Sequence, residues 1–253
     1  MKMTNLDILN IRKSIRSYSP EIIPVEIKNK LRSEVTFINT HEAGLKFQLF
    51  FDDNTPFTKF FKSYGTFINP KNYLAAVVDT GVADIYEKAG YFAEKFVIEI
   101  IQLGLGTCFV GGTYDREAVN AQLRAGEKIL FLVLFGFPLE KERFSEKLLL
   151  KIFKHNKKDI KDFFEPSSLY EDALREFPEL ETGLEAVSCA PSSLNKRPTR
   201  IFIREINGEK RLCAKVRDSN KKNLIDLGIA KYNFNFATDT ICEWGNESPL
   251  III

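Results

Sequence analysis

The sequence predicts an α+β fold, and three kinds of stretch lead to this. Apolar runs at 46–51, 73–78 and 129–135 are typical of strands. The segment 86–103 repeats apolar residues with a period near 3.6, which predicts an amphipathic helix. The pair Asn207-Gly208 stands between two further strand-like runs and predicts a β-hairpin.

The first elements follow from apolar spacing. Residues 5–13 predict a short helix that buries one apolar face and ends in a basic cluster. Residues 26–35 alternate apolar and charged positions at helical spacing. The run at 46–51 is a strand stopped by Asp-Asp-Asn, and the run at 73–78 is continuously apolar, as in a strand buried on both faces.

The helix at 86–103 is the clearest in the chain, and apolar residues on its flank indicate burial on more than one side. Gly104 follows it, and glycine suits the left-handed conformation that ends many helices. Asp115 is expected to open another helix, and the strand 129–135 comes after it.

In the second half, residues 140–161 form a connector rich in Lys and Glu, with apolar residues at helical spacing. Residues 169–189 predict one or two helices, and 223–236 predict a second long helix with an apolar side. The apolar end at 249–253 predicts a terminal strand or a buried tail.

Composition limits the class of protein. With 253 residues, 44% hydrophobic and 28% charged, the chain is typical of a globular protein with a substantial core. A formal charge of +2 does not favour a dedicated nucleic-acid binder. Acidic residues interrupt the positive charge of the connector, which weakens nucleic-acid binding there too. No apolar run is long enough to span a membrane, and the N-terminus does not resemble an export signal.

The four cysteines form no CxxC pair and no zinc spacing, so we expect reduced thiols in a cytoplasmic protein. Cys108 and Cys189 are more typical of core packing than of redox partners. The chain has two histidines, which argues against a His-rich metal site and predicts no metal.

The segment Arg12-Lys13-Ser14-Ile15-Arg16 gathers three cations and a hydroxyl. Arginine presents fixed planar donors to phosphate, so the cluster suits an anionic ligand. Two plainer interpretations stay open from the cluster alone: a solvated face and a nucleic-acid contact.

Three segments together resemble the FMN-dependent nitroreductase family. Arg12-Lys13-Ser14-Ile15-Arg16-Ser17-Tyr18 resembles its N-terminal signature of basic-x-Ser-x-basic and an aromatic residue. Residues 90–112, which include Leu-Gly-Leu-Gly-Thr, resemble its central helix and the turn after it. Ala190-Pro191-Ser192-Ser193-Leu194-Asn195-Lys196-Arg197-Pro198 resembles its Pro-Ser-x-x-Asn segment, with Arg197 and Thr199 in place of the usual Gln and Trp.

The resemblance implies a nitroreductase-like fold with antiparallel-rich mixed sheets flanked by helices. In the family the Pro-Ser segment follows the signature within a few tens of residues, whereas here it comes after residue 190. This order resembles a tandem, single-chain branch in which two half-domains form an internal pseudo-dimer. We expect one half at 1–165, with the N-terminal signature, and a diverged half at 166–253, with the Pro-Ser segment, in a monomeric chain.

The resemblance also implies roles for individual residues. Arg12 and Ser14 would contact the FMN phosphate and ribityl chain, and Arg16 would lie near N1 and O2 of the ring, where its charge would raise the reduction potential. The glycines would let the backbone approach the ring. The full expected FMN-binding set is Arg12, Lys13, Ser14, Arg16, Gly111, Gly112, Lys157, Pro191, Ser192, Ser193 and Asn195. Without the resemblance, residues 191–195 would equally suit a plain turn and helix cap.

The implied activity is a ping-pong NAD(P)H oxidoreductase. FMN would accept a hydride at N5 from NADH or NADPH and pass it to a small-molecule electron acceptor such as a nitroaromatic or a quinone. No side chain needs to act as acid or base, in agreement with the few histidines. The alternative is a flavin-binding or flavin-free scaffold with a regulatory or interaction role and no turnover.

Overall fold

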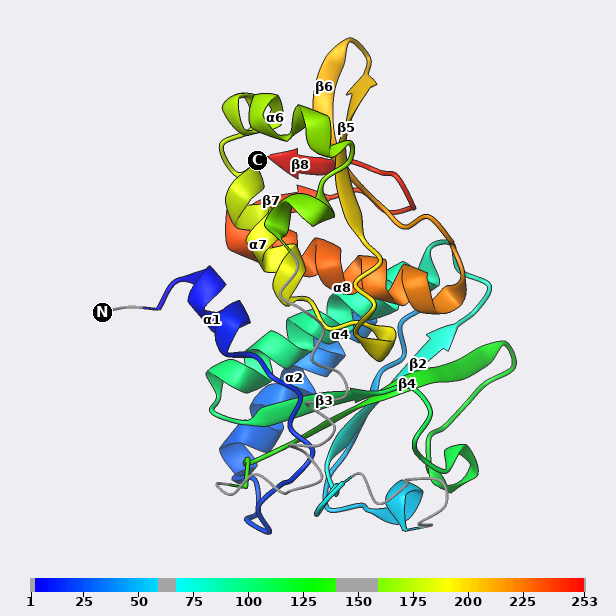
Figure 1. The fold of residues 1–253 in the computed structure, drawn as a ribbon. Helices are drawn as coiled ribbons and strands as arrows, with labels where there is room; N and C mark the ends of the chain where they lie inside the picture. Colours follow the sequence, from blue (N-terminus) through cyan, green and yellow to red (C-terminus); the bar gives the residue numbers. More distant parts are fainter. Residues whose placement is uncertain (1–2, 59–66, 140–158, 253) are drawn as a thin grey trace. The chain divides into compact units, whose positions relative to one another are not determined.

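The computed structural model describes residues 3–58, 67–139 and 159–252 (Figure 1). The chain divides into two compact units. One, here called unit 1, comprises Met1–Ile11, Tyr86–Lys95 and His155–Ile253; the other, unit 2, comprises Arg12–Ile85 and Phe96–Lys154. These units differ from the halves at 1–165 and 166–253, because the first helix and part of the central helix pack with the second half of the chain. The division into ancestral halves stays a prediction.

Unit 2 is built on a four-stranded antiparallel sheet with the order β1-β2-β4-β3. Strand β2 pairs with β4 in the centre, with Leu74 opposite Val133, and a β-bulge interrupts the pairing between Ala75 and Val77. Its elements are α2 (Val25–His41), β1 (Gln48–Phe50), η1 (Thr55–Phe57), β2 (Tyr73–Asp79), β3 (Gly106–Val110), η2 (Arg116–Ala118) and β4 (Glu127–Gly136), and it also holds the end of α4 (Ile85–Gln102).

The core of unit 2 lies on this sheet. All six residues from Tyr73 to Val78 are buried, which confirms the expected two-faced burial of this strand. One cluster joins alternate residues of β2, β3 and β4, with Tyr18 and Phe57 packed on it. Cys108 is buried in the same cluster at 3% exposure, which confirms its predicted packing role.

Unit 1 contains α1 (Asn5–Ile11), the start of α4, η3 (Ile160–Phe163), η4 (Ser167–Leu169), α6 (Tyr170–Glu176), α7 (Leu180–Cys189), η5 (Ser193–Asn195), β5 (Arg200–Ile206), β6 (Glu209–Lys215), α8 (Lys221–Thr238), β7 (Thr240–Cys242) and β8 (Leu250–Ile252). The predicted hairpin is confirmed: β5 and β6 pair in antiparallel register. Their turn places Asn207 and Gly208 at positive φ, as two-residue hairpin turns require.

The second pair of strands, β7 and β8, joins the hairpin through β6. Cys213 of β6 forms an antiparallel bridge with Pro249, immediately before β8, and Ala214 exchanges backbone hydrogen bonds with Ser248 and Glu247. The strands of unit 1 therefore follow the order β5-β6-β8-β7. This is the same order, strand for strand, as β1-β2-β4-β3.

Helices α4 and α8 cross at two glycines. A Cβ atom on Gly90 would overlap the carbonyl oxygen of Ile225, and a Cβ on Gly228 would overlap that of Glu87. Each glycine thus approaches the carbonyl three residues before the other glycine, so the crossing is reciprocal. The absence of a side chain at both positions is what lets the two backbones come this close.

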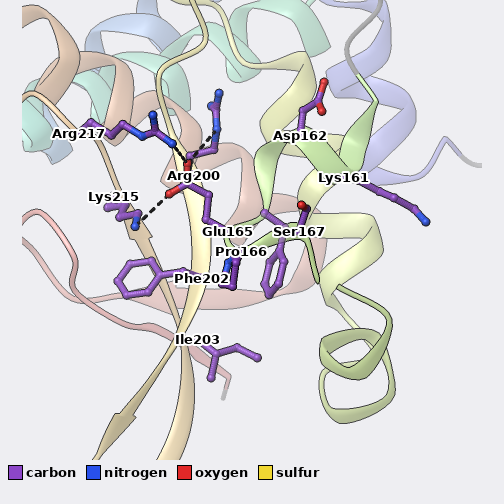
Figure 2. Close-up of a pocket in the computed structure, with 11 residues that line it drawn as sticks. Lys161, Asp162, Glu165, Pro166, Ser167, Arg200, Phe202, Ile203, Lys215 and Arg217 are labelled. Carbon is purple, nitrogen blue, oxygen red and sulfur yellow. Dashed lines mark hydrogen bonds and ion pairs between the residues drawn. The ribbon is translucent and has the colours of Figure 1, made fainter. Parts of the chain in front are cut away.

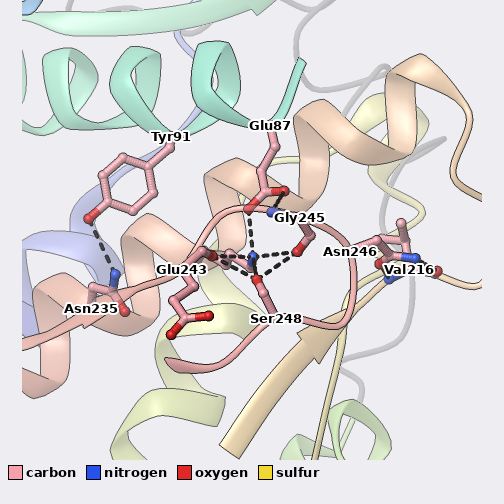
Figure 3. A network of polar contacts seen from close by, with 9 residues as sticks. Glu87, Tyr91, Val216, Asn235, Glu243, Gly245, Asn246 and Ser248 are labelled. Atoms are coloured by element: carbon pink, nitrogen blue, oxygen red, sulfur yellow. Dashed lines mark hydrogen bonds and ion pairs between the residues drawn. The ribbon is translucent and has the colours of Figure 1, made fainter. Parts of the chain in front are cut away.

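Helix α8 differs from the expected amphipathic helix, because its interior is polar as well as apolar. Lys231 is 1% exposed and donates hydrogen bonds to Glu87 Oε1 (2.5 Å), Gly245 O (2.9 Å) and Ser248 Oγ (2.8 Å). Figure 3 shows these acceptors converging from α4 and from the loop before β8. Gly245 N–H also donates to Glu87 Oε2 (3.0 Å), so the ion pair is buried but fully hydrogen-bonded.

The loop between β7 and β8 also carries Trp244, the only tryptophan of the chain. Its ring lies 5.2 Å from Tyr91 and 5.9 Å from Phe92, centroid to centroid, and Lys88 Nζ lies 5.5 Å from it. This ring therefore joins the loop to the first turns of α4.

The α+β prediction is confirmed, with bounds that shift by a few residues. The stretch at 106–110, expected as part of a turn, is strand β3, and Asp115 opens a single 3-10 turn in place of a helix. The helical spacing expected at 140–158 lies outside the described residues. Across the part of the chain that the structure describes, no helix is both long and apolar enough to cross a bilayer.

Candidate functional site

The N-terminal signature follows α1 as an extended segment held against β3 in unit 2. Ser14 forms a parallel bridge with Thr107, and Ile15 N–H donates to Thr107 O at 2.8 Å. Gly106 makes this contact possible, since a Cβ there would lie 2.5 Å from Ile15 Cγ1. The Tyr18 hydroxyl donates back to Ile15 O at 2.7 Å, which fixes the end of the segment.

The signature also carries three cations, Arg12, Lys13 and Arg16. Among the described residues no carboxylate pairs with Arg12, Lys13 or Arg16. Arg12 Nε is buried and has no hydrogen-bond partner in the part of the chain that the structure describes. A buried donor without an acceptor costs free energy, so an anionic ligand group that accepts from it fits this position.

The turn after β3 contains Gly111 and Gly112. Both are exposed, and a Cβ atom built on either would meet nothing within 4 Å. Open space therefore lies beside their backbone, which a ligand could approach. Crowding by the protein does not explain why these positions are glycine, because the chain itself leaves room for a side chain at both.

The Pro-Ser segment belongs to unit 1, where it links α7 to β5. Ser193 N–H donates to both carboxylate oxygens of Asp226, each at 3.1 Å, and Ser192 Oγ accepts from Arg197 N–H at 2.8 Å. Leu194 and Asn195 both take φ near +54°, in the left-handed region. Non-glycine residues seldom adopt this conformation outside turns and functional sites. The segment is thus a tight, hydrogen-bonded turn around the short 3-10 helix η5, and Ser192 at its N-cap position makes no side-chain capping hydrogen bond.

Asp226 is a residue that sequence reasoning missed. It lies on α8 at 5% exposure, and burial raises its pKa to about 7, although the hydrogen bond from Ser193 opposes the shift. The signal in the sequence was a lone carboxylate within an otherwise buried helix. Its partner could not be read from the sequence, because Ser193 stands 33 positions away.

The structure therefore brings together part of the predicted site. Arg12, Lys13, Ser14 and Arg16 stand beside β3, whose other end leads into Gly111 and Gly112, all in unit 2. Pro191, Ser192, Ser193 and Asn195 form one turn in unit 1. Their role in the same site stays a prediction, and Lys157 lies outside the described residues. No group of three or more His, Cys, Asp or Glu with metal-binding geometry occurs in the described part of the chain.

Comparisons with known proteins agree on one family. The family model described as "Putative TM nitroreductase" matches residues 5–238. A nitroreductase structure from Thermotoga maritima, titled putative, superposes with a TM-score of 0.61 at 19% identity, over 99% of this chain and 94% of that one. The nitroreductase-like fold is thereby confirmed. No curated protein sequence matches the chain.

Two further structures match part of the chain with low TM-scores. An FMN-dependent nitroreductase from Clostridium difficile gives 0.44 at 18% identity, over 60% of this chain and 98% of that one. A structure titled as a putative nitroreductase in complex with FMN, from Desulfovibrio desulfuricans, gives 0.42 at 15% identity, over 59% and 97%.

Proposed function

The chain belongs to the family described as "Putative TM nitroreductase", and on this premise we propose that it is an FMN-dependent NAD(P)H oxidoreductase. Its acceptor would be a nitroaromatic, a quinone or a similar small molecule. The observation that carries the proposal is the N-terminal signature, whose three cations are unpaired among the described residues and whose Arg12 Nε is a buried donor without an acceptor.

Bound FMN would supply hydride transfer between NADH or NADPH and the acceptor. The chain's own residues bind and orient it. Arg12 would donate to the phosphate through its buried Nε, with Lys13 and Ser14 as further donors. Arg16 would place a positive charge by the ring, and Gly111 and Gly112 would leave the ring room beside their backbone. The turn from Pro191 to Asn195 completes the proposed set.

We also propose that the two sheets descend from one half-domain and form an internal pseudo-dimer. Two observations support this. The pairs β5-β6 and β7-β8, joined by the bridge between Cys213 and Pro249, repeat the strand order of the four-stranded sheet, and each set has an 18-residue helix between its second and third strands in sequence. The helices α4 and α8 meet through reciprocal glycines, as self-complementary surfaces related by a two-fold axis do. The chain should then be a monomer with about one FMN, since one half has lost the signature.

The test is an absorbance spectrum of the purified chain, followed by anaerobic addition of NADH and then NADPH. We expect flavin bands that bleach with at least one reductant. Arg12→Met should weaken FMN binding about 10- to 100-fold, the value of a charge-assisted hydrogen bond. Arg124→Met, which removes an exposed guanidinium from the same unit, is the matched control and should bind FMN normally.

Two results would overturn the proposal. A colourless protein that does not take up added FMN would favour the scaffold alternative. If the chain binds flavin but neither NADH nor NADPH bleaches it, FMN binding would be supported and the proposed oxidoreductase activity would be contradicted. Two FMN per chain would contradict the loss of one site and leave the activity standing.

A further inference from the structure

Unit 1 contains an open cleft of about 730 Å³ that none of the preceding roles uses. One wall is the segment around Glu165 and Ser167, and the other is the hairpin of β5 and β6, with Arg200, Phe202 and Lys215. Figure 2 shows these side chains lining it. The volume lies within the range of about 300–1,000 Å³ that small-molecule sites usually occupy.

Three cations converge on one carboxylate in this cleft. Glu165 Oε1 accepts from Arg217 Nη2 at 2.6 Å and lies 3.8 Å from Arg200 Nε, while Oε2 lies 3.1 Å from Lys215 Nζ. The dashed lines in Figure 2 mark these contacts. The cluster therefore carries a surplus of two positive charges. Of the remaining charged residues of the lining, Lys161 is paired with Glu171 (2.7 Å) outside the cleft, and Asp162 is close enough to Arg200 to favour its charged form, although it forms no ion pair with it.

Glu165 cannot neutralise this positive surplus by losing a proton, because it is already ionised. Burial raises the pKa of Glu165, but the hydrogen bonds and charges of Lys215 and Arg217 outweigh burial and hold the pKa below its usual value. Glu165 is thus already ionised at neutral pH. For Arg200, burial and the nearby Arg217 lower the pKa, in opposition to Glu165, as expected for a cation that is only partly neutralised.

The cations are also held in place before any ligand arrives. Arg200 Nη1 donates to the carbonyl oxygens of Arg197 (3.0 Å) and Thr199 (2.7 Å), and its guanidinium lies 5.6 Å from the Phe163 ring. Lys215 Nζ lies 4.7 Å from the ring of Phe202. The side chains of both cations are at most 25% exposed. Fixed cations lose little entropy on binding, and partial burial strengthens their attraction for an anion.

We propose that this cleft binds a small molecule through a dianionic phosphate group, held by Arg200, Lys215 and Arg217. Two negative charges match the surplus, and the guanidinium groups offer the paired donors that suit phosphate oxygens. Phe202 and Ile203 give the adjoining wall an apolar surface for the rest of the ligand. The inference is independent of the FMN site, since none of the described residues proposed for that site lines this cleft.

The test is a calorimetric titration of the full chain, loaded with FMN and then desalted to remove unbound flavin, with inorganic phosphate and with phenyl phosphate at pH 8 and constant ionic strength. The bound FMN fills any flavin-phosphate site beforehand. Constant ionic strength keeps the screening of the protein's charges the same throughout the titration. If the chain proves not to retain FMN, the same titration of the flavin-free chain tests the cleft equally well. We expect both ligands to bind, with phenyl phosphate the tighter.

Variants separate a ligand site from an ion-pair cluster that only stabilises the fold. Arg217→Met removes a side chain that is 81% exposed, so the fold should persist and phosphate affinity should fall about tenfold. Glu165→Gln removes the carboxylate that competes with phosphate, so affinity should rise about tenfold. Arg211→Met, on β6 but outside the cleft, should bind as the unchanged chain does.

Absence of binding by the unchanged chain would overturn the proposal. So would equal affinities in the Arg217→Met and Glu165→Gln variants, because a site that depends on this charge balance must respond to them in opposite directions.

Discussion

The two sheets share a strand order but are stabilised by different kinds of interaction. In the first sheet, β2 and β4 have 7 and 10 residues, and their central residues are apolar and buried. In the second, their counterparts β6 and β8 have 7 and 3 residues. The helix beside them, α8, buries Asp226, Lys231 and Asn233 among its apolar residues.

The two sheets thus show two ways of stabilising the same strand order. Apolar burial is non-directional, so the first sheet should tolerate substitutions that keep volume and hydrophobicity. Buried polar groups need particular partners at particular distances, so the second sheet depends on single side chains. Substitutions in α8 should therefore have the larger and more specific effects.

The largest effect is expected at Lys231. Lys231→Met leaves Glu87 as a buried, unpaired carboxylate, and should lower the free energy of unfolding by about 3–5 kcal/mol. Urea denaturation followed by Trp244 fluorescence measures this, since Trp244 stands in the loop that Lys231 holds. Adding Glu87→Gln should recover part of the loss.

The control is Lys222→Met, which removes an exposed lysine from the same helix and should change stability by less than about 1 kcal/mol. If both lysine variants were equally stable, the second sheet would not depend on its polar network, and the contrast between the sheets would fail.

An intermediate effect is expected at the helix crossing. Glycine to alanine within a helix normally stabilises by about 0.5–1 kcal/mol. Gly90→Ala and Gly228→Ala should instead each destabilise by roughly 1–3 kcal/mol, because the new Cβ overlaps a backbone carbonyl. Since the crossing is reciprocal, the two costs should be similar, and the double variant should cost less than their sum. Thermal unfolding of the three variants would measure this, and an increase in Tm in either single variant would refute the close crossing.

An effect of similar size is expected at Asp226 at pH 8, and it disappears at low pH. Its pKa is about 7 in the folded chain, against an ordinary value of 3.8 for an aspartate. A raised folded pKa gives a contribution to stability that is complete below about pH 4 and is lost as the pH rises through 7. Asp226→Asn does not ionise, so it should be more stable than the unchanged chain at pH 8, by roughly 1–3 kcal/mol.

This advantage should shrink towards zero as the pH falls to 4, as a series of thermal melts would show. Asp239→Asn, at an exposed residue just after α8, should show no such trend. A constant difference between the Asp226→Asn variant and the unchanged chain at every pH would contradict the raised pKa.

The sequence predicted those elements whose cause is local. The hairpin at Asn207-Gly208 follows from turn chemistry, and α4 follows from its apolar period. Strand β3 escaped prediction, because Gly106 to Val110 resemble a glycine turn and become a strand through pairing with β4, more than 20 residues further along the chain.

The candidate site likewise has residues that the sequence could predict and residues that it could not. The basic signature could be found because its residues are adjacent in sequence, but its anchor on Thr107 could not. Asp226 was missed because its role depends on Ser193, in a distant loop. The reciprocal glycines were likewise invisible as a pair, since neither Gly90 nor Gly228 is explained without the other helix.

The repeated strand order has a consequence for how this chain can change. In a dimer of identical subunits one gene encodes both copies, so every substitution appears twice. If the two sheets descend from one half-domain, as proposed above, the counterparts lie at separate positions of a single chain, as Gly90 and Gly228 would, and each can mutate alone. One sheet can therefore acquire a polar interior, or lose a ligand-binding segment, while the other keeps its original form.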